Sequence, residues 1–338
     1  MIKVHCFVSC VCELLKKRGV DHRPYYFGVW DADFFVNEKG ALAYHADDVD
    51  HTFFKEWYET LYGITLKEWY EPLKSKSANI QKLVQLVEEK NKDTHVMVML
   101  DLALLPEREN KFHHSPFPHY VMLEKTENPT EWFMFDPDFR WEGRMQKEEI
   151  INAIQSPHVS GGYVFNGDQI RPPTDETVDA YFRTCMKAET NPLTEAVQRI
   201  VDSFWFDEDY LLSELGDALK QLPVLAIRKY AYEHAFAFFW FKLQFSETEF
   251  DNWCDEIEAL EKGYKIVQYR AIKLAKTKRQ ADHDQLCAQL KSQFEREMNI
   301  KQKLIHYFEK WNEERENVIN KNKGGSDERL DLYHFISK

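Results

Sequence analysis

The chain has 338 residues, of which 43% are hydrophobic and 30% are charged, and its net charge is −13. These values predict a globular protein with one large core or two ordinary ones, and they exclude a disordered chain. The excess of carboxylates argues against nonspecific binding to a nucleic acid backbone, although it would attract a cationic small molecule such as a polyamine. On charge alone, we interpret the acidity as a contribution to solubility.

The sequence lacks the patterns of membrane insertion and export. No run of eighteen apolar residues occurs, and the apolar start of the chain is interrupted by Glu13 and has no small-residue cleavage site. The six cysteines form neither a disulfide framework nor a Cys-x-x-Cys zinc pair. We therefore expect a cytoplasmic protein that binds neither membranes nor nucleic acid.

The first half of the chain mixes helical and strand patterns. Apolar residues spaced by three and four predict helices, at residues 5–18, 47–62, 77–92 and 145–154. Aromatic and β-branched runs between turn residues predict strands, at residues 24–30, 41–45, 95–102, 119–125, 132–136 and 161–166. A further short segment is expected within 66–73, and Gly19 is expected to end the first helix.

After Pro172 and Pro173 the sequence changes to long helical periodicity. Helices are predicted at residues 175–189, 193–203, 208–220, 223–244, 247–277 and 280–319, followed by a flexible joint at 321–326. The fold class is therefore α+β, with a mixed catalytic domain over 1–171 and an all-helical domain over 172–338. The charged helices could dock a partner protein, although solvated faces are the commoner meaning of such charges.

Cys6 is the candidate nucleophile because it begins the first predicted helix. Free N–H groups and the macrodipole at a helix N-terminus favour a thiolate. Cys10 lies one turn further along the same face, and Cys12 points elsewhere. A single cysteine is more often a small buried hydrophobe, so the hypothesis requires a base and an orienting group.

A predicted hairpin supplies both groups. His119 begins one strand and Asp136 ends the next, where Pro137 terminates the pairing. In an antiparallel pair the start of one strand lies beside the end of the other, so the two side chains should meet. The second imidazole nitrogen would then be free for Cys6, which predicts a Cys-His-Asp triad.

A metal site is the weaker interpretation of the histidines near this hairpin. His113 and His114 lie close to His119 in the sequence, and Asp101 precedes them. Adjacent histidines diverge in direction, and no set of ligands with regular spacing appears. We expect neither a metal nor a bound cofactor.

These motifs resemble two groups of papain-like proteins, the bacteriocin-leader peptidases and the butirosin-biosynthesis-H family. The shared features are Cys6 with Gly19 thirteen residues later, His119 at a strand start and Asp136 at a strand end. The pair His5-Cys6, the segment 101–106 and the segment 117–121 are similar to the second group. The resemblance covers roughly 1–170 and implies a papain-like fold with carrier-dependent acyl transfer. The peptidases place a glutamine before the cysteine, and its absence here leaves the oxyanion donors unassigned, although backbone N–H groups could serve.

Over its full length the sequence is similar to the condensing proteins of petrobactin biosynthesis, a siderophore pathway. This resemblance implies an amide-forming acyltransferase. It would move a 3,4-dihydroxybenzoyl group from the phosphopantetheine thioester of an aryl carrier protein, through acyl-Cys6, to an amine of spermidine or its citryl derivative.

An aromatic acyl group and a cationic amine would require aromatic and acidic side chains. The candidates for substrate contacts are Asp31, Asp33, Asp101 and Glu233, with Tyr25, Tyr26 and Trp30 as stacking surfaces. Aromatic residues at helical spacing over 230–241 are more often core than pocket. Glu233 lies within that apolar helix and would need a partner if buried.

Two other functions fit the same residues. A cysteine hydrolase, either peptidase or thioesterase, would use the same triad, with an open groove in the case of a peptidase. A non-catalytic binding protein on a degenerate papain-like scaffold would not need Cys6, His119 and Asp136 to converge. The distance between the Cys6 sulfur and the His119 ring separates the second alternative from the enzymes.

Overall fold

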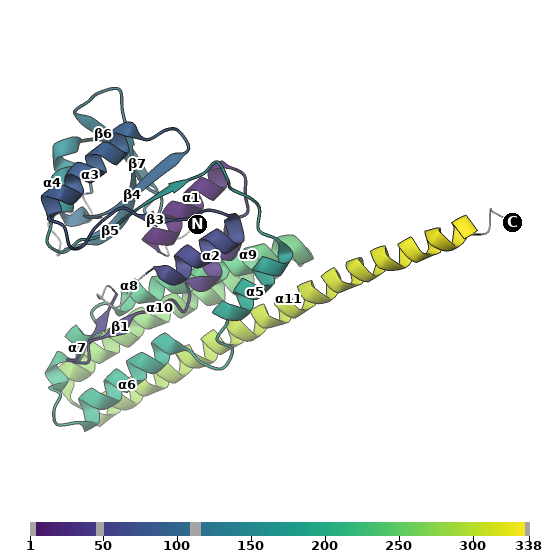
Figure 1. Ribbon diagram of the computed structural model, residues 1–338. Coiled ribbons are helices and arrows are strands. Elements are labelled where there is room, and N and C mark those ends of the chain that lie inside the picture. The colour runs from purple at the N-terminus through teal and green to yellow at the C-terminus, as the bar shows by residue number, and fades with distance from the viewer. Residues whose placement is uncertain (1–4, 45–50, 109–115, 335–338) are drawn as a thin grey trace. The chain divides into compact units, whose positions relative to one another are not determined.

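The computed structural model describes residues 5–44, 51–108 and 116–334, with side chains described as far as residue 317 (Figure 1). The chain divides into two compact units. The first contains Met1–Phe35, Ala43–Cys185 and Val224–Ala231, and the second contains Val36–Leu42, Met186–Pro223 and Tyr232–Lys338. The single boundary predicted after residue 171 differs from this division, since α5 (Asp175–Cys185) belongs to the first unit. The hydroxyl of Tyr181 on α5 donates to the backbone oxygen of Tyr25, 3.1 Å away.

The first unit is built on a six-stranded sheet in which every neighbouring pair is antiparallel. In spatial order the strands are β3 (Lys67–Glu68), β8 (Gly162–Asn166), β4 (Thr94–Asp101), β5 (Pro118–Lys125), β6 (Glu131–Asp136) and β7 (Trp141–Gln146). The class predicted from the sequence, α+β with a helical C-terminal region, is confirmed. The strand pattern near 141–146 was missed, and the helix expected from residue 145 begins at Lys147.

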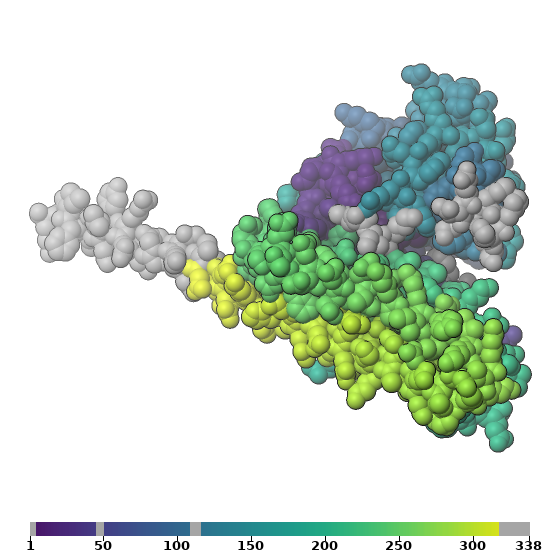
Figure 2. Space-filling model, turned by 180° about the vertical axis from the view of Figure 1, so that it is seen from behind, coloured from purple at the N-terminus to yellow at the C-terminus, as the bar shows by residue number. Residues whose placement is uncertain are grey.

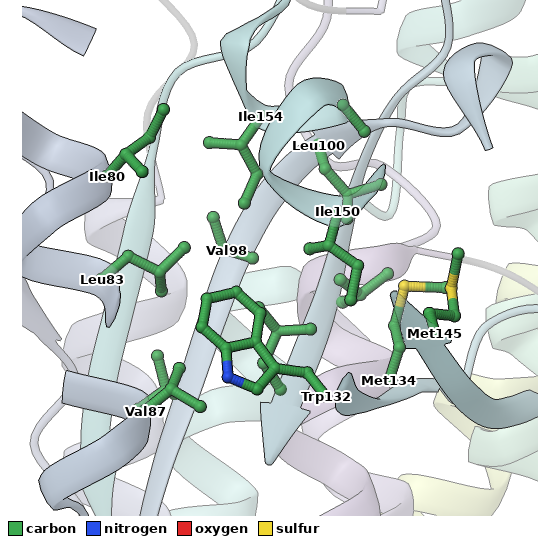
Figure 3. Packing of buried hydrophobic residues seen from close by; sticks show 14 of the residues in the cluster. Ile80, Leu83, Val87, Val98, Leu100, Trp132, Met134, Met145, Ile150 and Ile154 are labelled. Carbon is green, nitrogen blue, oxygen red and sulfur yellow. The ribbon is translucent and has the colours of Figure 1, made fainter. Parts of the chain in front are cut away.

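Helices cover both faces of this sheet. On one face, α3 (Lys76–Glu89) and α4 (Lys147–Gln155) enclose the main apolar core. Figure 3 shows Leu83 of α3, Val98 of β4 and Ile150 of α4 directed into the same space. On the other face, α1 (Cys6–Lys17) packs against β5, where the rings of Phe7 and Tyr120 lie 5.9 Å apart. Alternation along each strand produces this two-sided burial.

The strand predicted at residues 24–30 is wrong, because Arg23–Gly28 forms the 3-10 helix η1. Pro24 occupies its first turn, which a helix start tolerates. Tyr25 and Phe27 are fully buried and pack against the ring of Tyr181, at 6.5 and 6.3 Å. Aromatic residues buried on all sides lose the alternation that distinguishes a strand.

The other short elements of the first half agree in outline with the sequence. They are α2 (Thr52–Tyr62), the 3-10 helix η2 (Leu102–Leu104) and the two-stranded pair of β1 (Phe35–Val36) and β2 (Leu42–Ala43). The first residues of the helix predicted at 47–62 lie outside the described ranges.

The C-terminal part of the chain is helical, as predicted. Its elements are α6 (Pro192–Phe206), η3 (Leu212–Glu214), α7 (Leu215–Ala218), α8 (Leu222–Ala226), η4 (Ile227–Tyr230), α9 (Ala231–Leu243), α10 (Glu247–Thr277) and α11 (Gln280–His334). Helices α10 and α11 pack along each other, and Figure 2 shows the side chains of this region in green to yellow. The flexible joint predicted at 321–326 is wrong, because the backbone of α11 continues through it. An established helix extends at a small cost per residue, even across glycines.

Two buried contacts stabilise the second unit. The carboxylate of Glu297, which is fully buried on α11, accepts hydrogen bonds from the hydroxyls of Tyr232 and Tyr264, at 2.9 and 3.1 Å. The ammonium of Lys301 donates to the backbone oxygens of Lys187 and Thr190. Among the helices that the structure describes, none combines the length and hydropathy required to cross a membrane.

Candidate active site

The β5–β6 hairpin brings His119 and Asp136 together. Met122 pairs with Phe135, and by strand alternation His119 and Asp136 project to the same face. Nε2 of His119 lies 2.9 Å from Oδ1 of Asp136. Both side chains are buried, with 3% and 0% of their surfaces exposed. The contact predicted from the hairpin is therefore present.

Arg108 is a second cation on Asp136 that the sequence analysis missed. Its Nη2 lies 2.8 Å from Oδ2 of Asp136, and its side chain is only 6% exposed. The guanidinium also lies over the rings of Phe139 and Trp141, at 5.3 and 5.0 Å. Arg108 follows β4 in a segment without periodicity, so no local pattern indicates that it contacts Asp136. The only general indication was that a buried carboxylate requires a cation.

Charge compensation sets the protonation states of the pair. Burial disfavours the charged carboxylate, but His119, Arg108 and the Phe139 N–H together hold the pKa of Asp136 below its ordinary value. Burial likewise disfavours a charged imidazole, but Asp136 and Cys6 raise the pKa of His119 to about 10. His119 therefore carries a proton at neutral pH.

Cys6 begins helix α1, as predicted, after the extended residue His5. Cys6 lies near enough to His119 to raise the pKa of the imidazole, and the Cys6 side chain is 5% exposed. Because Nε2 of His119 faces Asp136, Nδ1 is the ring nitrogen left for the sulfur. A thiol, an imidazole and a carboxylate are thus neighbours in this part of the fold, which is a set of groups that can activate a nucleophile.

Asp138 connects this arrangement to the start of α1. Its Oδ1 accepts hydrogen bonds from the Ser9 hydroxyl at 2.9 Å and from the His5 N–H at 3.3 Å. Asp136, which contacts His119, lies two residues earlier. The end of β6 and the turn after it therefore contact both His119 and the start of the helix that carries Cys6. The sequence analysis took Pro137 only as a strand end and missed Asp138.

The other cysteines of α1 lack the environment of a nucleophile. Cys10 and Cys12 are completely buried, and burial raises the pKa of each thiol. The Cys10 sulfur donates to the backbone oxygen of Tyr120, 3.5 Å away. Both therefore stay as thiols, which leaves Cys6 as the candidate among the three.

A pocket of about 330 Å³ borders Asp136. Its walls include aromatic, acidic, basic and small side chains, from Tyr26, Phe135, Trp141, Glu13, Asp138, Glu142, Lys16, Arg140, Ser9 and Pro137. Tyr26 lies in this wall, whereas the neighbouring Tyr25, which we also predicted as a stacking surface, lies in the core.

Two of the predicted stacking residues have packing roles in the structure. Tyr25 and Trp30 are 0% and 1% exposed, and the Tyr25 hydroxyl donates to the backbone oxygen of Phe54. Asp31 forms a buried ion pair with Lys229, whose Nζ lies 2.9 Å from Oδ1 of Asp31 and 2.8 Å from the backbone oxygen of Trp30. The charge of Asp31 is thus compensated from within the chain.

The remaining predicted substrate residues are not gathered into one site. Asp33 is exposed, and its backbone oxygen accepts from Arg228. The carboxylate of Asp101 accepts from the Phe117 N–H and the Ser156 hydroxyl, so it holds the segment that leads into β5. Glu233 is half-buried on α9 in the second unit, and burial raises its pKa to about 7.

No cluster of three or more metal-ligating side chains occurs in the described part of the chain. His113 and His114, which suggested a metal site, lie outside the described residues.

The fold and the site define an α+β protein with a buried Cys-His-Asp arrangement in its sheet-containing unit. Two family models match the chain, the DUF6005 N-terminal domain over residues 1–170 and the DUF6005 C-terminal domain over residues 176–324. The petrobactin synthase of Bacillus anthracis is 47% identical over 318 residues, which covers 94% of this chain and 97% of that protein. The chain therefore belongs to the DUF6005 family. The full-length resemblance inferred from the sequence is confirmed by this relative, while the papain-like comparison stays a prediction.

Replacing Asp136 with Asn should lower the pKa of His119 from about 10 to below its ordinary 6.5, because burial then outweighs the remaining attraction. The raised pKa means that protonated His119 stabilises the fold below about pH 6.5, and that this contribution disappears as pH rises through about 10. Histidine ¹⁵N NMR titration measures the shift, with Asp138→Asn as the matched control. An unchanged His119 pKa in Asp136→Asn would contradict the assignment.

Replacing Asp31 with Ala should destabilise the protein by about 3–5 kcal/mol, because it leaves the Lys229 ammonium buried without its carboxylate. Urea unfolding measures the loss, and Asp33→Ala at the exposed neighbouring site should change stability by less than about 0.5 kcal/mol. If Asp31 instead contacts an amine substrate, the variant would raise the KM for that amine and leave the unfolding midpoint unchanged.

Proposed function

We propose that this chain is a cysteine-dependent acyltransferase of siderophore biosynthesis. It moves an aryl group, 3,4-dihydroxybenzoyl, from the thioester of an aryl carrier protein to an amine of spermidine or its citryl derivative. The observation that carries the proposal is the buried group of Cys6, His119 and Asp136, in which Nε2 of His119 lies 2.9 Å from Asp136 and Cys6 contributes to the raised pKa of the imidazole. The name of the relative, petrobactin synthase, supports the pathway.

The first half-reaction transfers the aryl group to the enzyme. Cys6 attacks the thioester carbonyl as a thiolate beside protonated His119, and the new carbon–sulfur bond replaces the bond to the pantetheine sulfur. His119 gives its proton to the departing pantetheine thiolate. Since one thioester replaces another, this step needs little driving force.

The second half-reaction forms the amide. The amine nitrogen attacks the acyl-Cys6 carbonyl while neutral His119 accepts its proton, and the Cys6 thiolate departs. Asp136 and Arg108 keep the imidazole oriented and its charge compensated in both halves. The N–H of Cys6 lies in the first turn of α1, where backbone donors lack intrahelical acceptors, so it is a candidate oxyanion donor.

Burial of the triad supports transfer over hydrolysis. Cys6, His119 and Asp136 are each no more than 5% exposed, so water has little access to the acyl-enzyme. The pocket beside Asp136 combines aromatic with acidic side chains, which suits an aryl group and a cationic amine.

Intact-mass measurement of the acyl-enzyme tests the mechanism. The protein is mixed with an aryl carrier protein loaded with 3,4-dihydroxybenzoate and is then treated with spermidine. We expect acylation of wild-type protein, discharge on addition of spermidine, and loss of both acylation and product in Cys6→Ala, with a rate at least about 10³-fold lower. Cys10→Ala, on the same helix, should still be acylated.

Three results would each contradict a part of the proposal. Product formation by Cys6→Ala at a rate near that of the wild type would exclude the covalent mechanism. Discharge of the acyl group to water at the same rate with and without amine would indicate a thioesterase. A folded wild-type protein that is never acylated would indicate a binding protein.

A further inference from the structure

The C-terminal half of helix α10, with the residues just after it, carries a concentration of positive charge in an acidic protein. Residues 262–281 contain no Asp or Glu, although the whole chain has a net charge of −13. The basic residues of this stretch are Lys262, Lys265, Arg270, Lys273, Lys276, Lys278 and Arg279. Such a segregated charge creates a local positive potential that the average composition conceals.

Three large apolar side chains are exposed on the same part of α10. Ile266, Tyr269 and Ile272 are 45%, 68% and 37% exposed. Their spacing of three residues places them on one face, and the opposite face buries Tyr264 and Val267 in the unit. Exposed apolar residues are ordinary when scattered, but a contiguous set surrounded by polar residues is typical of an interaction site.

The α10 basic face comprises these apolar residues and the lysines around them, namely Lys262, Lys265, Ile266, Tyr269, Ile272, Lys273 and Lys276. Three carboxylates pair with part of the charge. Glu258 contacts Lys262, Glu261 contacts Lys265, and Asp282 contacts both Lys273 and Arg279. The seven basic side chains of residues 262–281 outnumber these three carboxylates, so this stretch keeps an excess of positive charge.

We propose that the α10 basic face docks the acyl-donor protein, an acidic carrier that bears the aryl thioester. The inference rests on the proposed function, which requires such a donor. Charge complementarity is the argument for this occupant, since a positive face on an acidic protein attracts acidic partners selectively and speeds their encounter. The exposed tyrosine and isoleucines supply the desolvated contact that turns an encounter into a complex. A nucleic acid is the less suitable occupant, because Ile266, Tyr269 and Ile272 place apolar side chains among the lysines, whereas contacts with a nucleic acid backbone are polar.

Two acyl donors distinguish an effect on carrier docking from an effect on the acyl-transfer reaction itself. One is the aryl carrier protein loaded with 3,4-dihydroxybenzoate, and the other is the pantetheine thioester of the same acid, which has no protein surface to dock. The test variants are Lys262→Glu with Lys276→Glu, which reverses the charge on both sides of Tyr269, and Tyr269→Ala. The control, Lys291→Glu with Lys310→Glu, makes the same charge change at exposed positions of α11.

We expect each test variant to raise the KM for the loaded carrier at least tenfold and to leave both kinetic constants for the pantetheine thioester unchanged. Added NaCl should raise the carrier KM of the wild type more than that of the double variant, because screening weakens the electrostatic attraction. The control should match the wild type with both donors.

The inference is overturned if Tyr269→Ala and the double variant, both active on the pantetheine thioester, keep the carrier KM of the control. It is also overturned if a short duplex DNA binds this face, by fluorescence polarisation, while the carrier KM is unaffected by the variants. Failure of the wild type with both donors would instead refute the proposed function. Should the double variant lose activity with both donors through misfolding, the single Tyr269→Ala variant decides.

Discussion

A carboxylate buried between two cations is the interaction on which the candidate site depends. Asp136 has no exposed surface, and such a group would be neutral unless its charge were compensated. Arg108 on one oxygen, with His119 and the Phe139 N–H on the other, provide that compensation. The same interaction raises the pKa of the imidazole and leaves Nδ1 as the ring nitrogen that does not face Asp136. Removal of either cation would leave part of a buried charge unpaired, which is among the larger single costs in a folded protein.

The turn that follows β6 also holds the start of α1, where Cys6 lies. Asp136 orients the base, and Asp138 accepts hydrogen bonds from Ser9 and the His5 backbone at the start of α1. Three segments that are distant in the sequence thus meet at one turn. Cys6 lies at the N-terminus of α1, the helix end whose dipole favours an anion, and the imidazolium of His119 adds positive charge nearby.

The second unit has a different physical character. Its interior contains the fully buried Glu297, satisfied by two tyrosine hydroxyls, and a network of this kind defines a single packing for the helices around it. The packed pair of α10 and α11 can therefore present the α10 basic face on a rigid support. Rigid presentation matters for recognition, because little entropy is then lost on binding. On the proposed function, the chemistry would take place in the first unit and the second unit would recognise the donor.

The sequence by itself determined the local features, since adjacent elements in the chain obey local rules. The start of α1 at Cys6, the β5–β6 hairpin and the meeting of His119 with Asp136 follow from helix-terminus and antiparallel-pair geometry. Tertiary structure decided which side chains are buried and which distant residues pair. It placed Tyr25 and Trp30 in the core, joined Asp31 to Lys229, and brought Arg108 and Asp138 to the site. Those contacts depend on the packing of segments far apart in the chain, and no periodicity within a segment encodes its distant partner.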